Sequence, residues 1–281
     1  MPLTDAQWAR IEPLLPDRTP KKGGRWRDHR EVIDAIAFKF QSGTQWVHLP
    51  EKYGNWRGVY NRLRMWAVDG TWERVFTALM AQADANENLN WAVSVDSTIV
   101  RAHQHTAGAR KKEPQQANQP TPAIGRSRGG LTTKIHLAAD GHCRPLAFVL
   151  TAGQAGDAPA FTVVMARLRV PRRRGRPRTR PDVVLADKAY SSRAIREHLR
   201  KRDIRAVIPI PADQQGHRLR RGSQGGRPPA FDRENYKQRN TVERCINRLK
   251  QWRGIATRYE KTATIYLAGL HIAGIFLWSG S

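Results

Sequence analysis

Two short, mostly apolar runs that each end in an aspartate constrain the fold of this 281-residue chain more than any other feature. Residues 92–95 lead into Asp96, and residues 183–186 lead into Asp187. Short apolar runs are typical of buried strands, and carboxylates at the ends of such strands lie at the rim of an α/β sheet. The sequence therefore predicts a sheet with both aspartates at one rim. Either aspartate taken alone would also suit a turn or a helix cap.

Strands and helices alternate over the rest of the second part of the chain. Further strands are expected at 132–138, 145–150 and 206–210, with a hairpin turn at Asp140-Gly141 between the first two. Helices are expected at 157–168, 192–202, 233–252 and 262–278. This mixture predicts an α/β fold, with a mixed sheet and flanking helices.

The first 88 residues predict helices only. Thr4 and Gln7 suit a capping box at the start of one helix. Two further helices, at 29–41 and from 56 to 66, are separated by a turn at 42–44. Three arginines decorate the last helix: Arg57, Arg62 and Arg64. A small helix-turn-helix-like domain with these arginines suits the major groove of DNA.

The charge of the chain is strongly positive and unevenly distributed. Lys and Arg number 49 against 24 Asp and Glu, which gives a formal charge of +25. Residues 1–90 carry 13 basic and 11 acidic side chains, whereas the remaining residues carry 36 and 13. Such an excess indicates a polyanionic partner such as nucleic acid. Basic insertions rich in Gly and Pro are expected at about 105–130, 167–181 and 211–232.

A membrane location explains this charge poorly. The most apolar stretch, 262–278, is short for a spanning helix and contains His271, so a buried C-terminal helix is expected instead. No secretory leader pattern opens the sequence. Cys143 and Cys245 form no metal-ligand pattern. We therefore expect a reduced cytoplasmic protein without disulfides or structural zinc.

A third carboxylate stands among basic and aromatic residues at helical spacing. Tyr236, Arg239, Glu243 and Lys250 fall within an arc of about 60° on one helix face. In this setting Glu243 can complete a metal site with the two aspartates while its neighbours hold DNA phosphates. The spacing alone equally allows an exposed ion pair between Arg239 and Glu243.

The motif Tyr236-x2-Arg239-x3-Glu243-x6-Lys250 resembles the signature of DDE transposases of the insertion-sequence-five type. Ala189, in the segment that resembles the second-aspartate motif, stands where glycine is usual in the family. Segments that resemble other parts of these proteins are 3–8, 43–46, 95–103, 124–136 and 185–190. The resemblance thus extends over nearly the whole chain.

The resemblance implies a chain in two parts. Residues 1–88 would form a small all-α, helix-turn-helix-like DNA-binding domain. Residues 89–281 would form a ribonuclease-H-like catalytic domain, with a mixed five-stranded sheet and flanking helices. In that fold the first acid lies on the first strand, the second just after the fourth strand, and the glutamate on a late helix.

The resemblance also implies the chemistry. Asp96, Asp187 and Glu243 would hold two magnesium ions, with manganese as a possible substitute. A water would cut a phosphodiester at the end of the element, and the freed 3′-hydroxyl would then attack target DNA at the same site. No covalent enzyme intermediate is required.

The expected partner is double-stranded DNA, both the terminal inverted repeats and the target. The inverted repeats would be read by residues 1–88. Joining two ends needs two active sites, so a homodimer is expected in a bacterial, nucleoid-associated complex. The expected DNA contacts are Tyr236, Arg239 and Lys250 near the scissile bond, Arg126 and Arg128 on the backbone, and Arg57, Arg62 and Arg64 in the helical domain.

Two other functions stay open. One is a DNA-binding regulator derived from a transposase, which the presence of all three acids disfavours. The other is a stand-alone nuclease of the same fold, which the helical N-terminal domain and the Tyr-Arg-Glu-Lys stripe disfavour.

Overall fold

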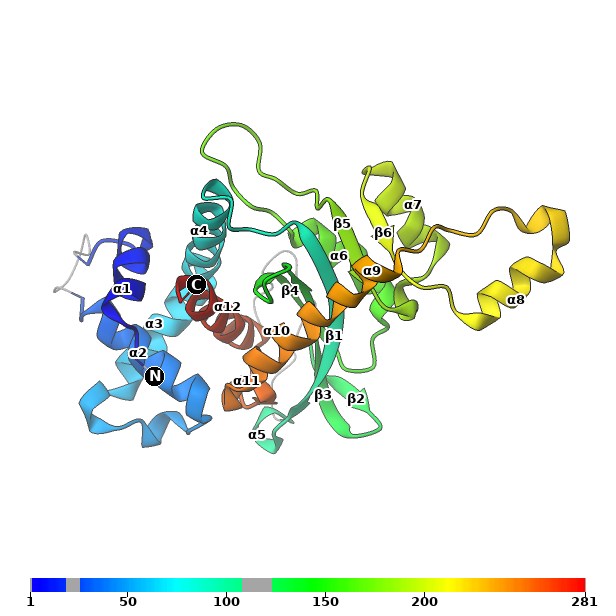
Figure 1. Cartoon of the computed structure of the whole chain (residues 1–281). Coiled ribbons are helices and arrows are strands. Elements are labelled where there is room, and N and C mark those ends of the chain that lie inside the picture. Colours follow the sequence, from blue (N-terminus) through cyan, green and yellow to red (C-terminus); the bar gives the residue numbers. More distant parts are fainter. Residues whose placement is uncertain (1, 19–25, 108–122, 281) are drawn as a thin grey trace.

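A seven-stranded mixed sheet forms the centre of the protein (Figure 1). The computed structural model describes residues 2–18, 26–107 and 123–280. The strands run in the order β2-β3-β1-β5-β6, with β4 paired to β3 and β7 paired to β1. They are β1 (Ala92–Ala102), β2 (Gly125–Ser127), β3 (Gly130–Ala139), β4 (Pro145–Ala152), β5 (Val183–Ala186), β6 (Arg205–Val207) and β7 (Thr257–Arg258).

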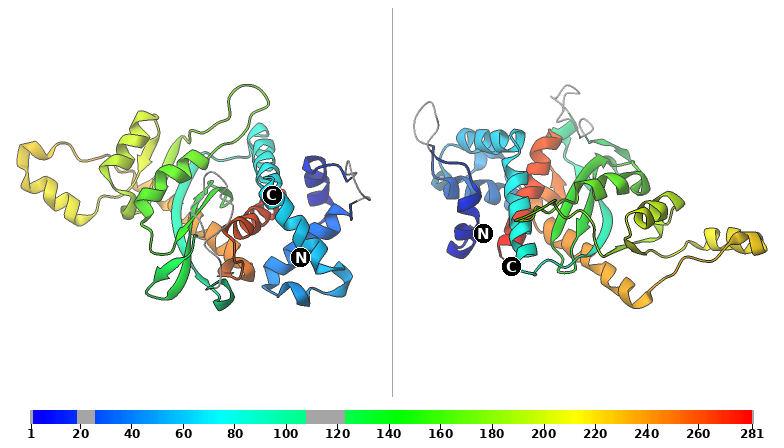
Figure 2. Two further views of the ribbon diagram at one scale, coloured as in Figure 1. Left: turned by 180° about the vertical axis from the view of Figure 1, so that it is seen from behind. Right: turned by 90° about the horizontal axis from the view of Figure 1, so that it is seen from above.

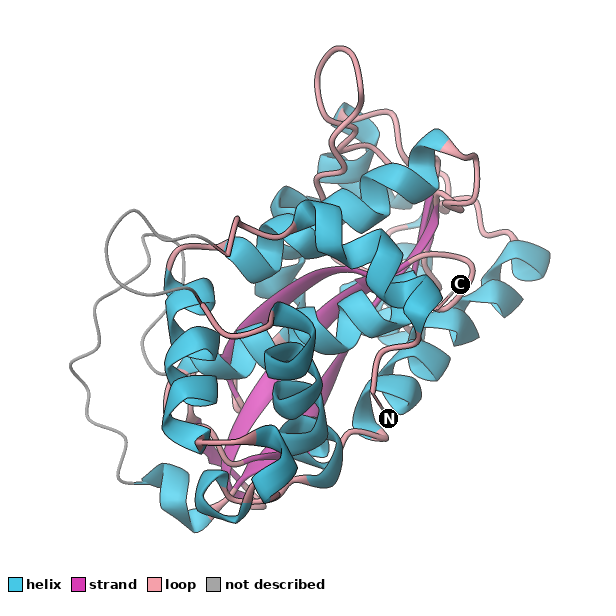
Figure 3. Cartoon of the chain, turned by 90° about the vertical axis from the view of Figure 1, so that its left-hand side faces the viewer, coloured by secondary structure: helices cyan, strands magenta, loops and turns pink. Residues whose placement is uncertain are grey.

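The five strands β4-β3-β1-β5-β6 form the predicted ribonuclease-H-like sheet. β3 is antiparallel to β1 and to β4, whereas β5 is parallel to both β1 and β6. Helices cover both faces of this sheet (Figure 3). The predicted fold class, a mixed sheet with flanking helices after a helical region, is therefore confirmed.

Asp96 lies inside a strand and not at its end, which corrects the prediction from the apolar run. β1 is 11 residues long and continues past Asp96 to Ala102. β3 pairs with it over the whole stretch from Ser94 to Arg101, so backbone hydrogen bonds sustain the strand where its side chains turn polar. Asp187 follows β5 as predicted. Because Val95 is aligned with Ala186 in parallel register, Asp96 in β1 lies beside the end of β5, where Asp187 follows.

Most predicted helices are present within one or two residues of their expected bounds. The helices are α1 (Asp5–Ile11), α2 (His29–Ser42), α3 (Trp56–Val68), α4 (Thr71–Ala85), α5 (Gln104–Ala107), α6 (Asp157–Arg167), α7 (Arg193–Lys201), α8 (Ala212–Arg220), α9 (Arg233–Tyr236), α10 (Asn240–Lys250), α11 (Arg253–Ala256) and α12 (Ala263–Ser279). The capping box of α1 is formed by Thr4 and Gln7 as predicted.

Other segments also differ from the sequence prediction, and the strand expected at 206–210 is the shorter β6, which ends at Val207. The expected helix at 233–252 is divided into α9, a 3-10 turn η6 (Lys237–Arg239) and α10. Residues 211–232, expected as a basic insertion rich in Gly and Pro, contain α8 within an arm that projects from the body (Figure 1). The predicted insertion at 105–130 begins within α5 and contains β2, which pairs with β3, and its residues 108–122 lie outside the described residues.

The C-terminal helix α12 joins the N-terminal helices to the sheet. Figures 1 and 2 show it between α4 and the strands, and it contacts α4 and β4. A Cβ at Gly269 would overlap the ring of Phe40, and one at Gly274 would overlap Phe76. Glycine at these positions thus lets α12 pack closely on α2 and α4. As predicted, α12 is a buried helix, and none of the described helices is long and apolar enough to span a membrane.

A buried ion pair ties the helical part to the segment after β7. The Lys39 ammonium of α2 contacts the Glu260 carboxylate, and their side chains are 2 % and 9 % exposed. Removing one partner of such a pair leaves the other charge buried without compensation.

We expect Glu260→Gln to lower the free energy of unfolding by about 3 kcal/mol, because Lys39 would lose its buried counterion. Urea unfolding followed by tryptophan fluorescence measures this change. The matched control is Glu197→Gln, which breaks the exposed ion pair of Glu197 with Arg193 and should leave stability unchanged. Equal stability of both variants would show that the Lys39–Glu260 contact does not hold the two parts together.

Candidate active site

The η6–α10 segment lies along one face of β1 (Figure 1). Three side-chain hydrogen bonds join them: Thr241 to Ser94 at 3.0 Å, Arg239 to Asp96 at 2.9 Å and Lys250 to Thr98 at 2.6 Å. The strand residues involved alternate along β1, and alternate side chains of a strand share a face. The Asp96 carboxylate therefore faces α10.

Arg239 brings Glu243 to Asp96. Its Nη2 lies 2.9 Å from Asp96 Oδ2, and its Nη1 lies 2.9 Å from Glu243 Oε1. The ion pair between Arg239 and Glu243 that the helical spacing allowed is therefore formed. The same guanidinium also reaches the strand, so the pair belongs to a cluster around Asp96 and is more than an isolated surface contact.

Asp187 completes the cluster from the neighbouring strand. It caps the 3-10 turn η4 (Lys188–Tyr190), and its Oδ1 accepts the Ala189 N–H at 2.8 Å. Burial raises the pKa of the Asp96 carboxyl, and the negative charge of Asp187 adds to this rise, whereas the Ser97 N–H and Arg239 oppose it. The register of β1 and β5, which aligns Val95 with Ala186, places Asp187 near Asp96.

The oxygen chemistry of this cluster suits a hard divalent cation. Carboxylates are the ligands that magnesium and manganese prefer. As the side chains lie, no group of three or more His, Cys, Asp or Glu among the described residues is spaced to hold a metal ion. The Arg239 guanidinium lies between Asp96 and Glu243 and supplies positive charge there. The donor set therefore fits a metal, provided that Arg239 turns away.

Tyr236 and Lys250, the other residues of the stripe, are partly buried against the sheet. Tyr236 packs against a small apolar cluster that includes Leu185 and Val207. Lys250 donates to Thr98, as described above. In this arrangement both residues help to hold α9 and α10 on the sheet, and their contact with DNA stays a prediction.

Of the five other arginines expected to contact DNA, four are exposed: Arg57, Arg64, Arg126 and Arg128. Arg62 is buried, which corrects the expectation that it lies on the surface. Its guanidinium bonds His29 Nδ1 at 2.9 Å and stacks on Trp26. The burial of Arg62 could have been predicted from the helical periodicity, since residues 59, 62, 63 and 66 follow the spacing of a buried helix face.

The sequence analysis missed a fourth carboxylate near the site. Asp157, the first residue of α6, accepts a hydrogen bond from Ser97 Oγ at 2.6 Å. Ser97 directly follows Asp96 in β1. No apolar run or helical stripe marks Asp157, and the antiparallel pairing that brings α6 beneath β1 was not visible in the sequence.

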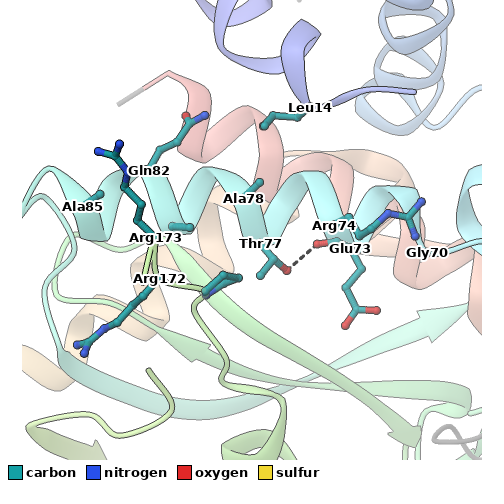
Figure 4. A pocket seen from close by; sticks show the side chains of 12 residues that line it. Leu14, Gly70, Glu73, Arg74, Thr77, Ala78, Gln82, Ala85, Arg172 and Arg173 are labelled. Atoms are coloured by element: carbon teal, nitrogen blue, oxygen red, sulfur yellow. Dashed lines mark hydrogen bonds between the residues drawn. The ribbon is translucent and has the colours of Figure 1, made fainter. Parts of the chain in front are cut away.

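The acids lie apart from the cavity shown in Figure 4. This cavity, of about 650 Å³, runs along α4. Leu14 and the alanines of α4 give it an apolar floor, and Arg172 and Arg173 line one side. None of the three carboxylates lines it. The candidate site lies instead between β1 and the η6–α10 segment, where the side chains of Asp96 and Arg239 are 19% and 21% exposed and that of Glu243 is 48% exposed.

Comparison with known proteins gives two family matches. Residues 3–76 match the family described as putative transposase of the IS4/5 family, and residues 88–278 match the transposase DDE domain. The uncharacterized protein y4sN of Sinorhizobium fredii is 40% identical over 109 residues, which cover 39% of this chain and 83% of that protein. A putative transposase for insertion sequence element IS6501 of Brucella ovis is 28% identical over 148 residues, 53% of this chain and 98% of the relative.

Solved structures of low similarity include a Mos1 transposase paired-end complex with left transposon end. It is 15% identical and covers 86% of this chain and 83% of that chain. Its TM-score to this chain is 0.25.

Burial raises the pKa of Asp96, so ionising its carboxyl costs more free energy in the folded protein than in the unfolded chain. An acid with a raised folded pKa lowers stability as pH rises through that pKa. Asp96→Asn removes this cost and can still accept a bond from Arg239. We therefore expect its Tm at pH 7, measured by circular dichroism, to equal or exceed that of the wild type.

The control is Asp140→Asn. The Asp140 side chain is fully buried and accepts the Arg144 Nε–H at 3.0 Å and the Arg144 backbone N–H at 2.8 Å. Its Tm should fall, because the charged partner of Arg144 is lost. A similar fall in Tm for Asp96→Asn would contradict this prediction, because it would mean that the charged Asp96 carboxylate stabilises the folded protein.

Proposed function

Because the chain belongs to the DDE transposases of the IS4/5 family, we propose that it cuts and rejoins DNA at the ends of an insertion sequence. Asp96, Asp187 and Glu243 hold the divalent ions that this reaction needs. The observation that carries the proposal is their convergence: Asp96 lies in β1, Asp187 directly follows the adjacent parallel strand β5, and Glu243 is tied to Asp96 through Arg239.

Each side chain has a distinct task in this proposal. Magnesium or manganese, when bound, supplies Lewis acidity that lowers the pKa of the attacking water and stabilises the leaving oxygen. Asp96 is held in place by β1, and Asp187 by its cap on η4. Glu243 lies on α10 and is half exposed, with its side chain 48% accessible, so it can turn toward the aspartates.

Arg239 exchanges its partners during binding. In the structure it offsets the negative charge of Asp96 and Glu243. A divalent ion held by Asp96 and Glu243 would supply the positive charge that the guanidinium now supplies there. Arg239 then binds a DNA phosphate beside the acids, since guanidinium groups form paired hydrogen bonds with phosphate. Arg239 can therefore form the observed ion pairs before DNA binds and the predicted contact with DNA afterwards.

DNA binding draws on the positive charge of the whole chain. The exposed arginines Arg126 and Arg128 near β2, and Arg57 and Arg64 on α3, contact phosphates. Contacts of this kind position the protein on DNA, whereas base contacts from residues 1–88 read the inverted repeats. Two copies of the chain act together, because two ends are joined in one complex.

A second function follows from the same ion pairs. A chain whose acids stayed bridged by Arg239 would bind DNA without cutting it, as a regulator derived from a transposase. The two functions differ in a single assay with labelled DNA that carries the ends of the element.

We expect wild-type protein to nick this DNA in magnesium and to stop when the metal is chelated. Glu243→Gln should bind equally well but cut more slowly by on the order of 100-fold or more, since one charged ligand is lost. Gel assays of binding and of cleavage measure both properties. Glu234→Gln, an exposed glutamate of α9, is the control and should cut like the wild type.

Three other outcomes count against the proposal in different ways. Equal cutting by Glu243→Gln and wild type would show that Glu243 is not one of the catalytic carboxylates. Cutting that continues after the metal is chelated would show that the reaction needs no divalent ion. Binding without cutting by the wild type would favour the regulator.

A further inference from the structure

A second polar network lies on the face of β1 opposite α10. Ser97 Oγ donates to Asp157 Oδ1 at 2.6 Å, and Lys134 Nζ contacts the same oxygen at 3.0 Å. Ser97 is aligned with His136 of β3, and Lys134 lies two residues before His136. Residues opposite and two apart in a sheet share a face. The network therefore lies on the α6 face of the sheet, while Asp96 faces α10.

Asp157 is committed to this network. Its side chain is 28 % exposed, and the Lys134 side chain is only 10 % exposed. Lys134 Nζ also donates to the Ala155 carbonyl at 2.6 Å, which fixes the ammonium beside the carboxylate. A carboxylate that already bonds a lysine and a hydroxyl is a poor ligand for a further cation. Asp157 thus acts on the site through other residues.

Ser97 links this network to the first acid. Its side chain bonds Asp157, and its backbone N–H donates to Asp96 Oδ1 at 2.7 Å. A shift of Ser97 would therefore move both the strand at Asp96 and the hydrogen bond that orients the Asp96 carboxylate.

The same helix also supports the second acid. Asp187 caps the turn η4, whose last residue is Tyr190. The Tyr190 side chain is buried, and its ring lies 5.9 Å from the ring of Phe161 in α6. The start of α6 thus contacts β1 through Asp157, and its middle contacts η4 through Phe161.

We propose that Asp157 is a positioning residue, which sets the separation of Asp96 and Asp187 by holding β1 to α6 through Ser97. The proposal rests on the proposed function, because it assumes that these acids bind a divalent ion. Asp96 and Asp187 repel each other before an ion arrives. Residues that fix the ligands from behind commonly change metal affinity by 10- to 100-fold when removed.

Direct binding of Mn²⁺ to the purified chain tests the proposal, with free Mn²⁺ measured by electron paramagnetic resonance. Ser97→Ala deletes only the hydroxyl and leaves the Lys134–Asp157 ion pair intact. We expect it to weaken Mn²⁺ binding on the order of 10-fold. Ser97→Thr keeps a hydroxyl and should restore most of the affinity. Asp157→Asn, which loses the charge that Lys134 needs, should weaken binding at least as much as Ser97→Ala.

Two controls separate positioning from folding. Ser42→Ala removes a hydroxyl that bonds Phe38 in α2, remote from the acids, and should bind Mn²⁺ like the wild type. The Tm of each variant is measured alongside. A role in positioning predicts weaker Mn²⁺ binding by Ser97→Ala than by Ser97→Thr even where their Tm values agree.

The possible outcomes distinguish failure of the positioning role from failure of the proposed function. Wild-type affinity in both Ser97→Ala and Asp157→Asn would overturn the positioning role and leave the three-acid site standing. Equal losses in Ser97→Ala and Ser97→Thr would overturn it too, because packing would then explain the effect. If wild type and Asp96→Asn bind Mn²⁺ equally, the acids hold no ion, and the proposed function fails along with this inference.

Discussion

The contact between β1 and the η6–α10 segment is the interaction on which the candidate site depends. Asp96 belongs to the centre of the sheet, whereas Glu243 belongs to a helix that follows it much later in the chain. Only the alignment of that helix along β1 brings the two carboxylates to one guanidinium. Bonds to Ser94 and Thr98, on either side of Asp96, keep the helix from sliding along the strand.

β1 holds this position because it is paired on both sides. β3 runs antiparallel along one edge, and β5 runs parallel along the other. The first pairing sustains a long strand through a polar stretch, and the second puts Asp187 beside Asp96. One face of the same strand then meets α10, and the other meets α6. The site thus combines a rigid central strand with acids that come from three separate elements.

The positive charge of the chain explains why such a cluster of acids is tolerated. Three carboxylates brought together on an ordinary surface would repel one another. Here Arg239 offsets two of them, and Lys134 offsets Asp157 on the opposite face. The same surplus of basic residues that favours DNA also stabilises the acids before DNA is bound.

Much of this fold was predictable from the sequence, because its elements have strong periodicity. The run at 183–186, the hairpin at Asp140-Gly141 and the buried helix α12 follow directly from apolar patterns and turn residues. The fold class and the three acids were indicated by their spacing and by a family resemblance. The metal-binding role of these acids stays a prediction.

The features that sequence analysis missed depend on contacts between distant segments. β1 extends past Asp96 because β3 pairs with it, and no local pattern encodes that pairing. Asp157 gains its place from the packing of α6 beneath β1. Arg62 is a different case. Its position in the helical repeat placed it on the buried face of α3, but an arginine is usually exposed, so the sequence analysis expected it on the surface.

The central claim is that three carboxylates distant in sequence form one metal site, and iron-directed cleavage of the protein backbone tests it most directly. Fe²⁺ bound in place of magnesium reacts with added hydrogen peroxide to give Fe³⁺, hydroxide and a hydroxyl radical that breaks the chain next to the metal, and added ascorbate reduces the iron again. The account predicts three breaks, near Asp96, Asp187 and Glu243, that excess Mg²⁺ suppresses. Breaks at one of these places alone, or at sites remote from all three, would contradict it.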